Sequence, residues 1–437
     1  MLKDQIIEGF RVSINQLIPG TEVTVFSEIP NEIKTAGLYK DDSSFARIDD
    51  FTIFLWFNDV LKSKIYLKIQ RNIIQISHYE EMILKSIPEL MNNFQDIHSE
   101  EFLKFLLKLS SKISFDDLLI AKFLNQQQNK QSKGQLDLIL VLQELTFRRY
   151  EGQKCTSGFV FTEEIEEFKS KVESTRYRFF EFDKKAELTH SFFSTPATYR
   201  YVDGRNSFYL IDNRRHIHGI LRLKNPDSFS LVDRIGNRHL KELLEDMPGN
   251  SWISFVGLKD EVYIIVGENQ QLKWSNNHWH FRNREIILSL LEKFGLNNGL
   301  DKLLVNVIFS LSEIKYGSII LMPEDDNILP PIIGKIDQST IGMSLRNSIQ
   351  STSMLELASS NSILGILSSD GLTTISKKGS ILSCGDIIDI NKAAQKKIQG
   401  GGRSQAAIAS SYFGIALKIS QDGPISFYYK GEKLIEL

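Results

Sequence analysis

The sequence has 437 residues, too many for one ordinary hydrophobic core, and at about 100 to 200 residues per domain we expect roughly three domains. Its composition, 42% hydrophobic and 24% charged, is that of an average folded protein, so general disorder is excluded. Lys and Arg total 52 against 54 Asp and Glu, a balance that provides no overall field for attracting nucleic acid or an anionic membrane.

The two cysteines, Cys155 and Cys384, lie far apart and form no CxxC spacing, which indicates a reducing compartment and no metal framework. The first segment, MLKDQIIEGFRVSINQL, has charges among its apolar residues and predicts an amphipathic helix rather than a secretory signal. The longest apolar runs are well short of the ~20 residues needed to span a bilayer. We therefore expect a cytoplasmic protein without a membrane partner.

Residues 1–134 are expected to form an α+β N-terminal domain. After the first helix come the strand-like segments TEVTVFSEI and KIYLKIQRNIIQI, and then the helical segment EEFLKFLLKLSSKI. The polar run NQQQNKQSKG at 125–134 lacks apolar anchors and predicts a linker or an exposed loop. No catalytic constellation is evident in this domain.

Residues 135–283 are expected to form a β-rich middle domain, with a helix at TEEIEEFKSKVEST and strands at YRYVDGRNSFYLID, HIHGILRL, SWISFVGL and EVYIIVG. The segment WSNNHWHFRN concentrates aromatic residues and histidines, and we interpret it as a half-buried strand in preference to a ligand site. A zinc site is the weaker alternative, because no cysteine or carboxylate spacing supports the histidines His216, His218, His278 and His280.

Residues 284–437 are expected to form an α/β domain with a mixed sheet flanked by helices. Helices are predicted at NREIILSLLEKFG, LDKLLVNVIFSLSEIK and SLRNSIQSTSMLELASS, and a strand at GSIILMP. The segment ILGILSSDGLTTIS reads as a strand with Asp370 and Gly371 in its middle, where glycine indicates a bend or a close backbone approach. A carboxylate there can hold a divalent metal against phosphates, and an ordinary hairpin turn is the alternative.

A second candidate feature follows at IQGGGRSQAA, residues 398–407. Backbone N–H groups at a glycine loop and helix start, together with Arg403, predict a phosphate site. The alternative is a flexible loop that caps a helix. The GxxxxGK[ST] pattern of a P-loop does not occur, and no dinucleotide-binding fingerprint is evident.

The order of these motifs, closed by Gly-Pro-Ile-Ser at 423–426, resembles the diadenylate cyclase domain over about residues 285–437. Members of that family typically carry Asp-Gly-Ala and Arg-His-Arg-Ala-Ala, and join two ATP molecules into cyclic di-AMP when two domains meet face to face. The resemblance implies that Asp370 is the metal ligand, for Mg or Mn, and the catalytic residue of an active domain. It also implies a nucleotide-binding set consisting of Asp370, Gly371, Leu372, Gly401, Gly402, Arg403, Ser404 and Gln405.

This sequence departs from the family pattern in its charges. Ser404 and Gln405 stand where the family has His and a second Arg, Leu372 replaces the alanine, and 408–411 offer no carboxylate where the family has Ser-Glu. A neutral donor in place of a cation forfeits roughly half the strength of a phosphate contact. We therefore expect a sensor or regulator that binds a nucleotide or cyclic dinucleotide.

Two other functions stay open. The first is an active metal-dependent diadenylate cyclase or nucleotidyltransferase with a degenerate basic motif, which would use ATP and act as at least a homodimer. The second is an interaction protein in which this domain is purely structural.

Overall fold

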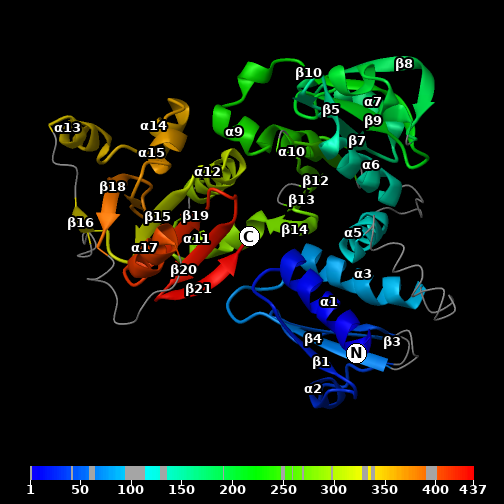
Figure 1. Cartoon of the computed structure of the whole chain (residues 1–437), viewed down its shortest axis with the longest axis horizontal. Helices are drawn as coiled ribbons and strands as arrows, with labels where there is room; N and C mark the ends of the chain where they lie inside the picture. The colour runs from blue at the N-terminus through cyan, green and yellow to red at the C-terminus, as the bar shows by residue number, and fades with distance from the viewer. Residues whose placement is uncertain are drawn as a thin grey trace. The chain divides into compact units, whose positions relative to one another are not determined.

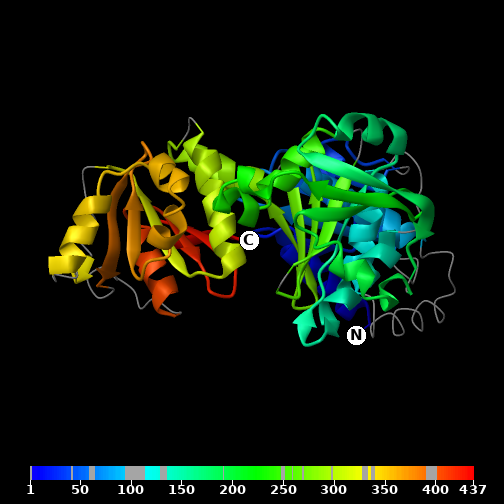
Figure 2. The ribbon, with the colours of Figure 1, turned by 90° about the horizontal axis from the view of Figure 1, so that it is seen from above.

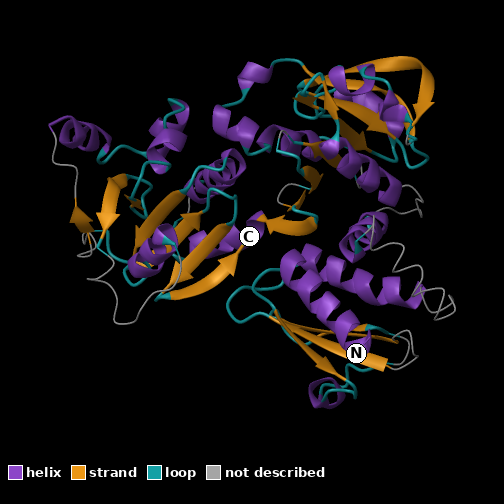
Figure 3. Cartoon of the chain, viewed as in Figure 1, coloured by secondary structure: helices purple, strands orange, loops and turns teal. Residues whose placement is uncertain are grey.

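The computed structural model describes residues 2–40, 43–58, 64–93, 114–127, 135–189, 191–247, 251–257, 259–267, 270–296, 299–326, 333–335, 340–389 and 401–437. The chain divides into two compact units, which we call the first unit (1–226 with 240–283) and the second unit (227–239 with 284–437). Both contain helices and strands (Figures 1 and 3), so the expected mixture of α and β structure in several parts is confirmed. The predicted boundary at 134 stays a prediction. The predicted helix at 100–113 lies outside the described residues, as does most of the predicted linker.

A four-stranded antiparallel sheet, ordered β1-β4-β3-β2, begins the first unit. Along β3 alternate residues face opposite ways, as the two-residue period of a strand requires. Ile53 and Leu55 join the main core with helices α1 and α3, and Phe54 and Trp56 join a smaller cluster with Ile33 of α2. The elements are α1 (Leu2–Leu17), β1 (Glu22–Phe26), α2 (Asn31–Thr35), β2 (Phe45–Arg47), β3 (Thr52–Asn58), β4 (Lys64–Gln70), α3 (His78–Asn93) and α5 (Phe115–Gln126).

An eight-stranded sheet completes the first unit, in the order β14-β13-β12-β11-β7-β9-β10-β8. Only the β7–β9 pair is parallel among its described pairings. The main core of the unit runs from Phe10 to Phe281 and includes residues of both predicted upstream domains. Its further elements are α6 (Gln135–Phe147), β5 (Arg149–Tyr150), β6 (Gln153–Lys154), β7 (Gly158–Phe161), α7 (Ile165–Val172), β8 (Tyr177–Glu187), η1 (Phe192–Ser194), α8 (Ala197–Arg200), β9 (Ser207–Ile211), β10 (His216–Leu223), η2 (Pro226–Ser228), α10 (Arg238–Glu245), β11 (Trp252–Val256), β12 (Val262–Val266), β13 (Gln270–Ser275) and β14 (His278–Asn283).

The segment WSNNHWHFRN is a hairpin, so its interpretation as one strand was wrong. β13 pairs with β14, and Trp274 lies opposite Trp279. Asn276 and Asn277 form the turn with φ values of 52° and 65°, a left-handed pair that asparagine tolerates better than most residues and that suits a two-residue hairpin.

A seven-stranded mixed sheet forms the second unit, ordered β16-β18-β17-β15-β19-β20-β21. Its colours run from yellow-green to red in Figure 2. β15 pairs with β17 in parallel and with β19 antiparallel. The elements are α9 (Leu231–Ile235), α11 (Arg284–Lys293), α12 (Leu300–Ile314), β15 (Ser318–Pro323), β16 (Ile333–Lys335), α13 (Thr340–Ile349), α14 (Met354–Ser359), α15 (Ile363–Leu367), β17 (Leu372–Ile375), β18 (Ile381–Ile388), α17 (Gly402–Ser410), β19 (Gly414–Ile419), β20 (Ile425–Tyr429) and β21 (Glu432–Glu436).

Both faces of the central strand β15 are covered, because all six of its residues are buried. Ile319 and Leu321 pack with Ala406 and Ala407 of α17. These alanines let the helix axis approach the sheet closely, which fixes the start of α17 relative to the strands beneath it.

Two predicted elements of the second unit differ from the structure. ILGILSSDGLTTIS was expected to be one strand, but Ile363, Leu364 and Leu367 have helical spacing and form the buried side of α15. Asp370 and Gly371 lie in the turn that follows, and β17 starts at Leu372. SLRNSIQSTSMLELASS was expected to be one helix, but it is interrupted between α13 and α14.

The interruption between α13 and α14 has a local cause. Ser351 has a φ of 70°, which no right-handed helix accommodates, and its N–H donates to the carbonyl of Ile381 at 2.8 Å. Ser353 then caps α14 by accepting from the N–H of Glu356.

Across the described part of the chain, no helix combines the length and apolarity that a membrane crossing requires.

Candidate functional site

The amino ends of two neighbouring parallel strands form the floor of the candidate site. In the register of β15 and β17, Ile319 lies opposite Leu372. Gly317 and Asp370 each lie just before one of these two strands. The residue before β15 and the carboxylate predicted from the sequence therefore lie at the same end of two neighbouring strands.

Gly371 is required by the backbone at this point. Its φ is 104°, and an added Cβ would lie 2.8 Å from the carbonyl oxygen of Asp386 and 2.8 Å from the carbonyl carbon of Gly385. Gly385 also has a positive φ, of 69°, where the β17–β18 register shifts. The expected close backbone approach is therefore present, between β17 and β18. It leaves the Asp370 side chain exposed.

Helix α17 begins over the same end of the sheet. Gly401 is its N-cap and supplies no side-chain hydrogen bond, and the first hydrogen bond of the helix runs from the N–H of Gln405 to the carbonyl of Gly401 at 3.1 Å. The N–H groups of the first turn thus have no partner within the helix, which is the arrangement that attracts anions at helix starts.

Arg403 connects the two predicted motifs in space. A Cβ added at Gly317 would lie 2.5 Å from Cζ of Arg403, so the guanidinium lies directly over this glycine. Asp370 precedes β17, which pairs with β15, and the two motifs therefore lie at the same end of these strands. Neither Asp370 nor Arg403 has a hydrogen bond or an ion pair with another residue that the structure describes.

A cation that the motif analysis missed lies beside Ser404. Nζ of Lys418, on β19, donates to Oγ of Ser404 at 3.0 Å. Lys418 pairs with Ile319 on one side and with Ser426 on the other, and Ser426 pairs with Glu436. The lysine within the otherwise apolar GIALKI strand was the available signal, since a half-buried charge in a central strand calls for a reason.

Glu436 balances part of this positive charge. Burial raises the pKa of its carboxyl, but the hydrogen bond from Ser426 Oγ at 2.7 Å and the charges of Lys433 and Lys418 outweigh burial, and the net pKa is lowered. Glu436 is therefore ionised at neutral pH and offsets part of the charge of Lys418.

Two of the predicted nucleotide-binding residues, Leu372 and Gln405, have side chains that are buried or half-buried. Leu372 is completely buried and packs in the core with Ile319 and Ala407, so only its backbone is available to a ligand. Gln405 is half-buried in the first turn of α17. Gly401 and Gly402 are exposed, and a Cβ at either would meet no atom within 4 Å.

The nearby carboxylate of Asp386 has a structural role. It is fully buried in β18 and forms an ion pair with Arg346 of α13, which ties that helix to the sheet. Asp370 is thus the exposed carboxylate beside the β17–β18 approach.

The described residues contain no group of three His, Cys, Asp or Glu side chains suited to a metal ion. Mg²⁺ is nevertheless often held by one or two carboxylates together with substrate phosphates. Asp370 fits that pattern only if a nucleotide supplies the remaining oxygens. For the zinc alternative, His216 and His218 both contact Asp212, at 3.4 and 2.9 Å, but among the described residues these side chains form no group suited to a metal ion.

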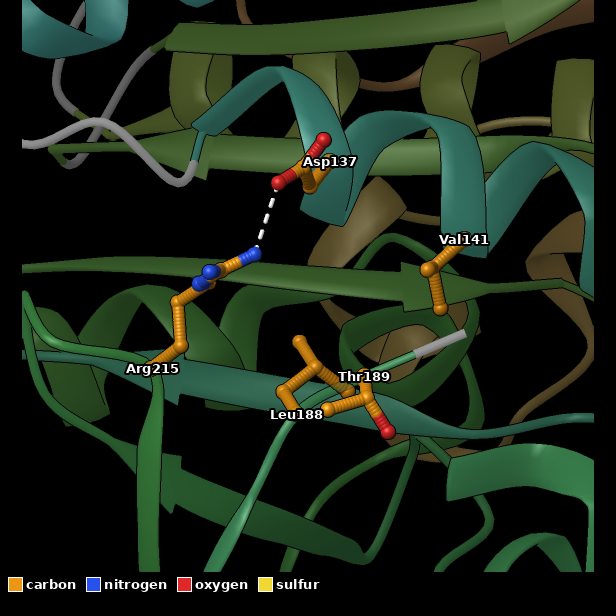
Figure 4. Close-up of a pocket in the computed structure, with 5 residues that line it drawn as sticks. All are labelled: Asp137, Val141, Leu188, Thr189 and Arg215. Carbon is orange, nitrogen blue, oxygen red and sulfur yellow. Dashed lines mark hydrogen bonds and ion pairs between the residues drawn. The ribbon is translucent and has the colours of Figure 1, made fainter. Parts of the chain in front are cut away.

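A hollow of about 220 Å³ in the first unit is lined by Asp137, Val141, Leu188, Thr189 and Arg215 (Figure 4). Its one cation, Arg215, pairs with Asp137 at 2.6 Å. Because the two charges are matched, this hollow has no excess charge with which to select a ligand.

No known family model matches the chain, and no curated protein matches it. Among solved structures, the chain aligns in part with the crystal structure of a hypothetical membrane spanning protein from Bacillus cereus. The alignment has 19% identity and a TM-score of 0.23, and covers 34% of this chain and 69% of that one. A likeness at this level indicates neither a shared fold nor a shared function.

Proposed function

We propose that residues 284–437 bind a nucleotide or cyclic dinucleotide and act as a sensor or regulator, through a divergent domain resembling the diadenylate cyclase domain. The observation that carries the proposal is the meeting of Arg403, the start of α17 and Asp370 at one end of β15 and β17. Two motifs about thirty residues apart in the sequence thereby contribute to one surface.

The electrostatics of this surface favour an anion. The start of a helix carries roughly half a positive charge, and free N–H groups there bond phosphate oxygens. Arg403 adds a planar guanidinium that can bond a phosphate with two N–H groups. Lys418 adds a second cation beside Ser404.

Lys418 bears directly on the charges that the basic motif lacks. The family pattern has a histidine where this chain has Ser404, and here a lysine from β19 donates to Ser404. Lys418 thus offsets part of the lost charge for binding. Gln405 is itself neutral where the family has an arginine, so the charge is recovered only in part, which favours binding over catalysis.

An active cyclase or nucleotidyltransferase remains the second candidate, because Asp370 is exposed and has no ion pair with another residue that the structure describes. In that function Asp370 would hold Mg²⁺ or Mn²⁺ against the phosphates of ATP, and a second copy of the domain would supply the other nucleotide. Asp370→Asn should then abolish any cyclic dinucleotide formed from ATP, as measured by chromatography.

Calorimetry with cyclic di-AMP and with ATP plus Mg²⁺ tests the binding proposal. Arg403→Ala should weaken binding about tenfold to hundredfold, since it removes a hydrogen bond to a charged group. Lys378→Ala is the matched control, because Lys378 is an exposed cation in the turn at the opposite end of β17.

Wild-type protein that binds neither ligand would refute the proposal and leave the structural function for this domain. Equal weakening by both variants would mean that general charge, rather than this site, holds the ligand.

A further inference from the structure

A second candidate site lies in the first unit, and its lining includes carboxylates where the site in the second unit has cations. A hollow of about 410 Å³ is formed by one side of α1, the first turn of α5 and His278 at the β13–β14 turn. Its lining includes Glu8, Ser13, Gln16 and Asp116. None of its lining residues is among those proposed to bind a nucleotide, and the inference is independent of that function.

Asp116 is the central group of this hollow. Its residue exposure is only 3%, and within the described structure its Oδ1 has no hydrogen-bond partner. Its Oδ2 lies 3.9 Å from Nδ1 of His278, which is a charged contact only when the imidazole is protonated. A carboxylate buried this deeply without a cation is costly, so its presence calls for a partner.

The neighbouring residue Asp117, at the same helix start, is a carboxylate with a purely structural role. Its Oδ2 accepts from the N–H of Ser114 in a capping box, and its Oδ1 accepts from Gln143 at 2.6 Å and Trp279 at 2.7 Å. Asp117 therefore satisfies the cap and the core, and Asp116 is not needed for either.

Gln16 provides a second acceptor in the same hollow. Its Oε1 is also buried without a described hydrogen-bond partner. Glu8 adds an exposed carboxylate on the same side of α1, where it pairs with Arg11 at 3.0 Å. The hollow thus has an excess of negative over positive groups, and Ser13 and His278 are the donors facing Asp116.

The titration of Asp116 is consistent with this imbalance. Burial raises the pKa of its carboxyl, and the charge of Asp117 raises it further, whereas Ser13 and His278 lower it. The effect of burial is larger and the net pKa is raised, so the chain's own donors do not fully stabilise the ionised form. A ligand cation would add the missing stabilisation.

We propose that this hollow binds a ligand carrying a primary ammonium or guanidinium group, which pairs with the carboxylate of Asp116 and hydrogen-bonds the side-chain amide of Gln16. An ammonium has three N–H donors and a guanidinium five, enough to serve both acceptors at once. Val12 and Phe115, which also line the hollow, provide an apolar surface for the carbon chain of the ligand.

Calorimetry on the full chain with agmatine, which carries both groups, tests the proposal, with butan-1-ol as a neutral ligand. Agmatine should bind and butan-1-ol should not. Asp116→Asn should weaken agmatine binding about tenfold to hundredfold, and Gln16→Leu by a smaller factor. Glu89→Gln, which removes an exposed carboxylate outside the hollow, should leave the affinity unchanged.

A thermal melt separates binding from folding. Because Asp116→Asn removes an unpaired buried charge, the variant should melt at the same temperature as the wild type or higher, while losing affinity. Failure of agmatine to bind the wild type, or equal binding by wild type and Asp116→Asn, would overturn the proposal. Similar weakening in Glu89→Gln would reduce the effect to general attraction by surface acids and would also overturn it.

Discussion

Replacing Gly371 by alanine tests whether the backbone approach between β17 and β18 shapes the candidate site. At a φ of 104° an L-residue is strained by about 1 to 3 kcal/mol. The added Cβ would also meet backbone atoms of Gly385 and Asp386 at 2.8 Å, and backbone cannot rotate away as a side chain can. We expect Gly371→Ala to lower the free energy of unfolding of the second unit by about 2 to 6 kcal/mol, the strain plus about 1 to 3 kcal/mol for an overpacked contact.

Gly365→Ala is the matched control, because Gly365 lies inside α15 of the same unit and an added Cβ would meet nothing within 4 Å. Alanine in a helix is favoured over glycine by about 0.5 to 1 kcal/mol, so this variant should be slightly more stable than the wild type. The two Gly-to-Ala changes are therefore expected to act with opposite signs.

Urea unfolding followed by far-ultraviolet circular dichroism measures both changes. Tryptophan fluorescence reports the first unit separately, because all four tryptophans belong to it. Hydrogen exchange at 372–388 should rise in Gly371→Ala. A loss below about 0.5 kcal/mol, the range of ordinary surface changes, would refute the reasoning.

Three further predictions follow from the contacts. Lys418→Met should weaken anion binding severalfold in calorimetry while preserving the fold, because it removes the cation that donates to Ser404; unchanged affinity would exclude Lys418 from the site. Burial, together with neighbouring positive groups, lowers the pKa of His280 to about 4 from 6.5. Between these pH values the unfolded chain binds more protons than the folded chain, so stability should fall as the pH falls from 6.5 to 4. His280→Gln should flatten this part of a melting-temperature profile, and a profile identical to wild type would contradict the assignment. Arg71→Met should cost about 3 to 5 kcal/mol in fluorescence-detected urea unfolding, because it leaves Glu80 buried without its partner at 2.7 Å; the Arg71→Met/Glu80→Leu double variant should recover most of the loss.

Helices and strands with a clear apolar period were predictable from the sequence. The helical period in 284–314 matches α11 and α12, and the apolar GSIILMP matches the buried strand β15. Short apolar runs were harder, because four or five residues fit a strand and one turn of helix equally well. For this reason the segment ILGIL was predicted to be a strand, whereas it forms the helix α15.

The components of the candidate site were predictable, but their arrangement was not. Asp370, Gly371 and Arg403 were identified because glycine and charge mark unusual backbone and anion contacts. The position of Arg403 over Gly317 depends on the packing of α17 against β15, which is a contact between segments far apart in the sequence. Lys418 and Asp116 were missed because each is a single charge whose surroundings come from other elements.

Strand β8 has a further consequence for the behaviour of the protein in concentrated solution. It is the edge of the eight-stranded sheet, and it is long, with most of its eleven residues partly or fully exposed. A long apolar edge would offer its free N–H and C=O groups to a strand of another molecule and so promote aggregation. The exposed residues of β8 instead include Arg178, Glu181, Lys184 and Lys185, whose desolvation opposes such pairing. The sheet is thus protected from growth at this edge by the charges along its last strand.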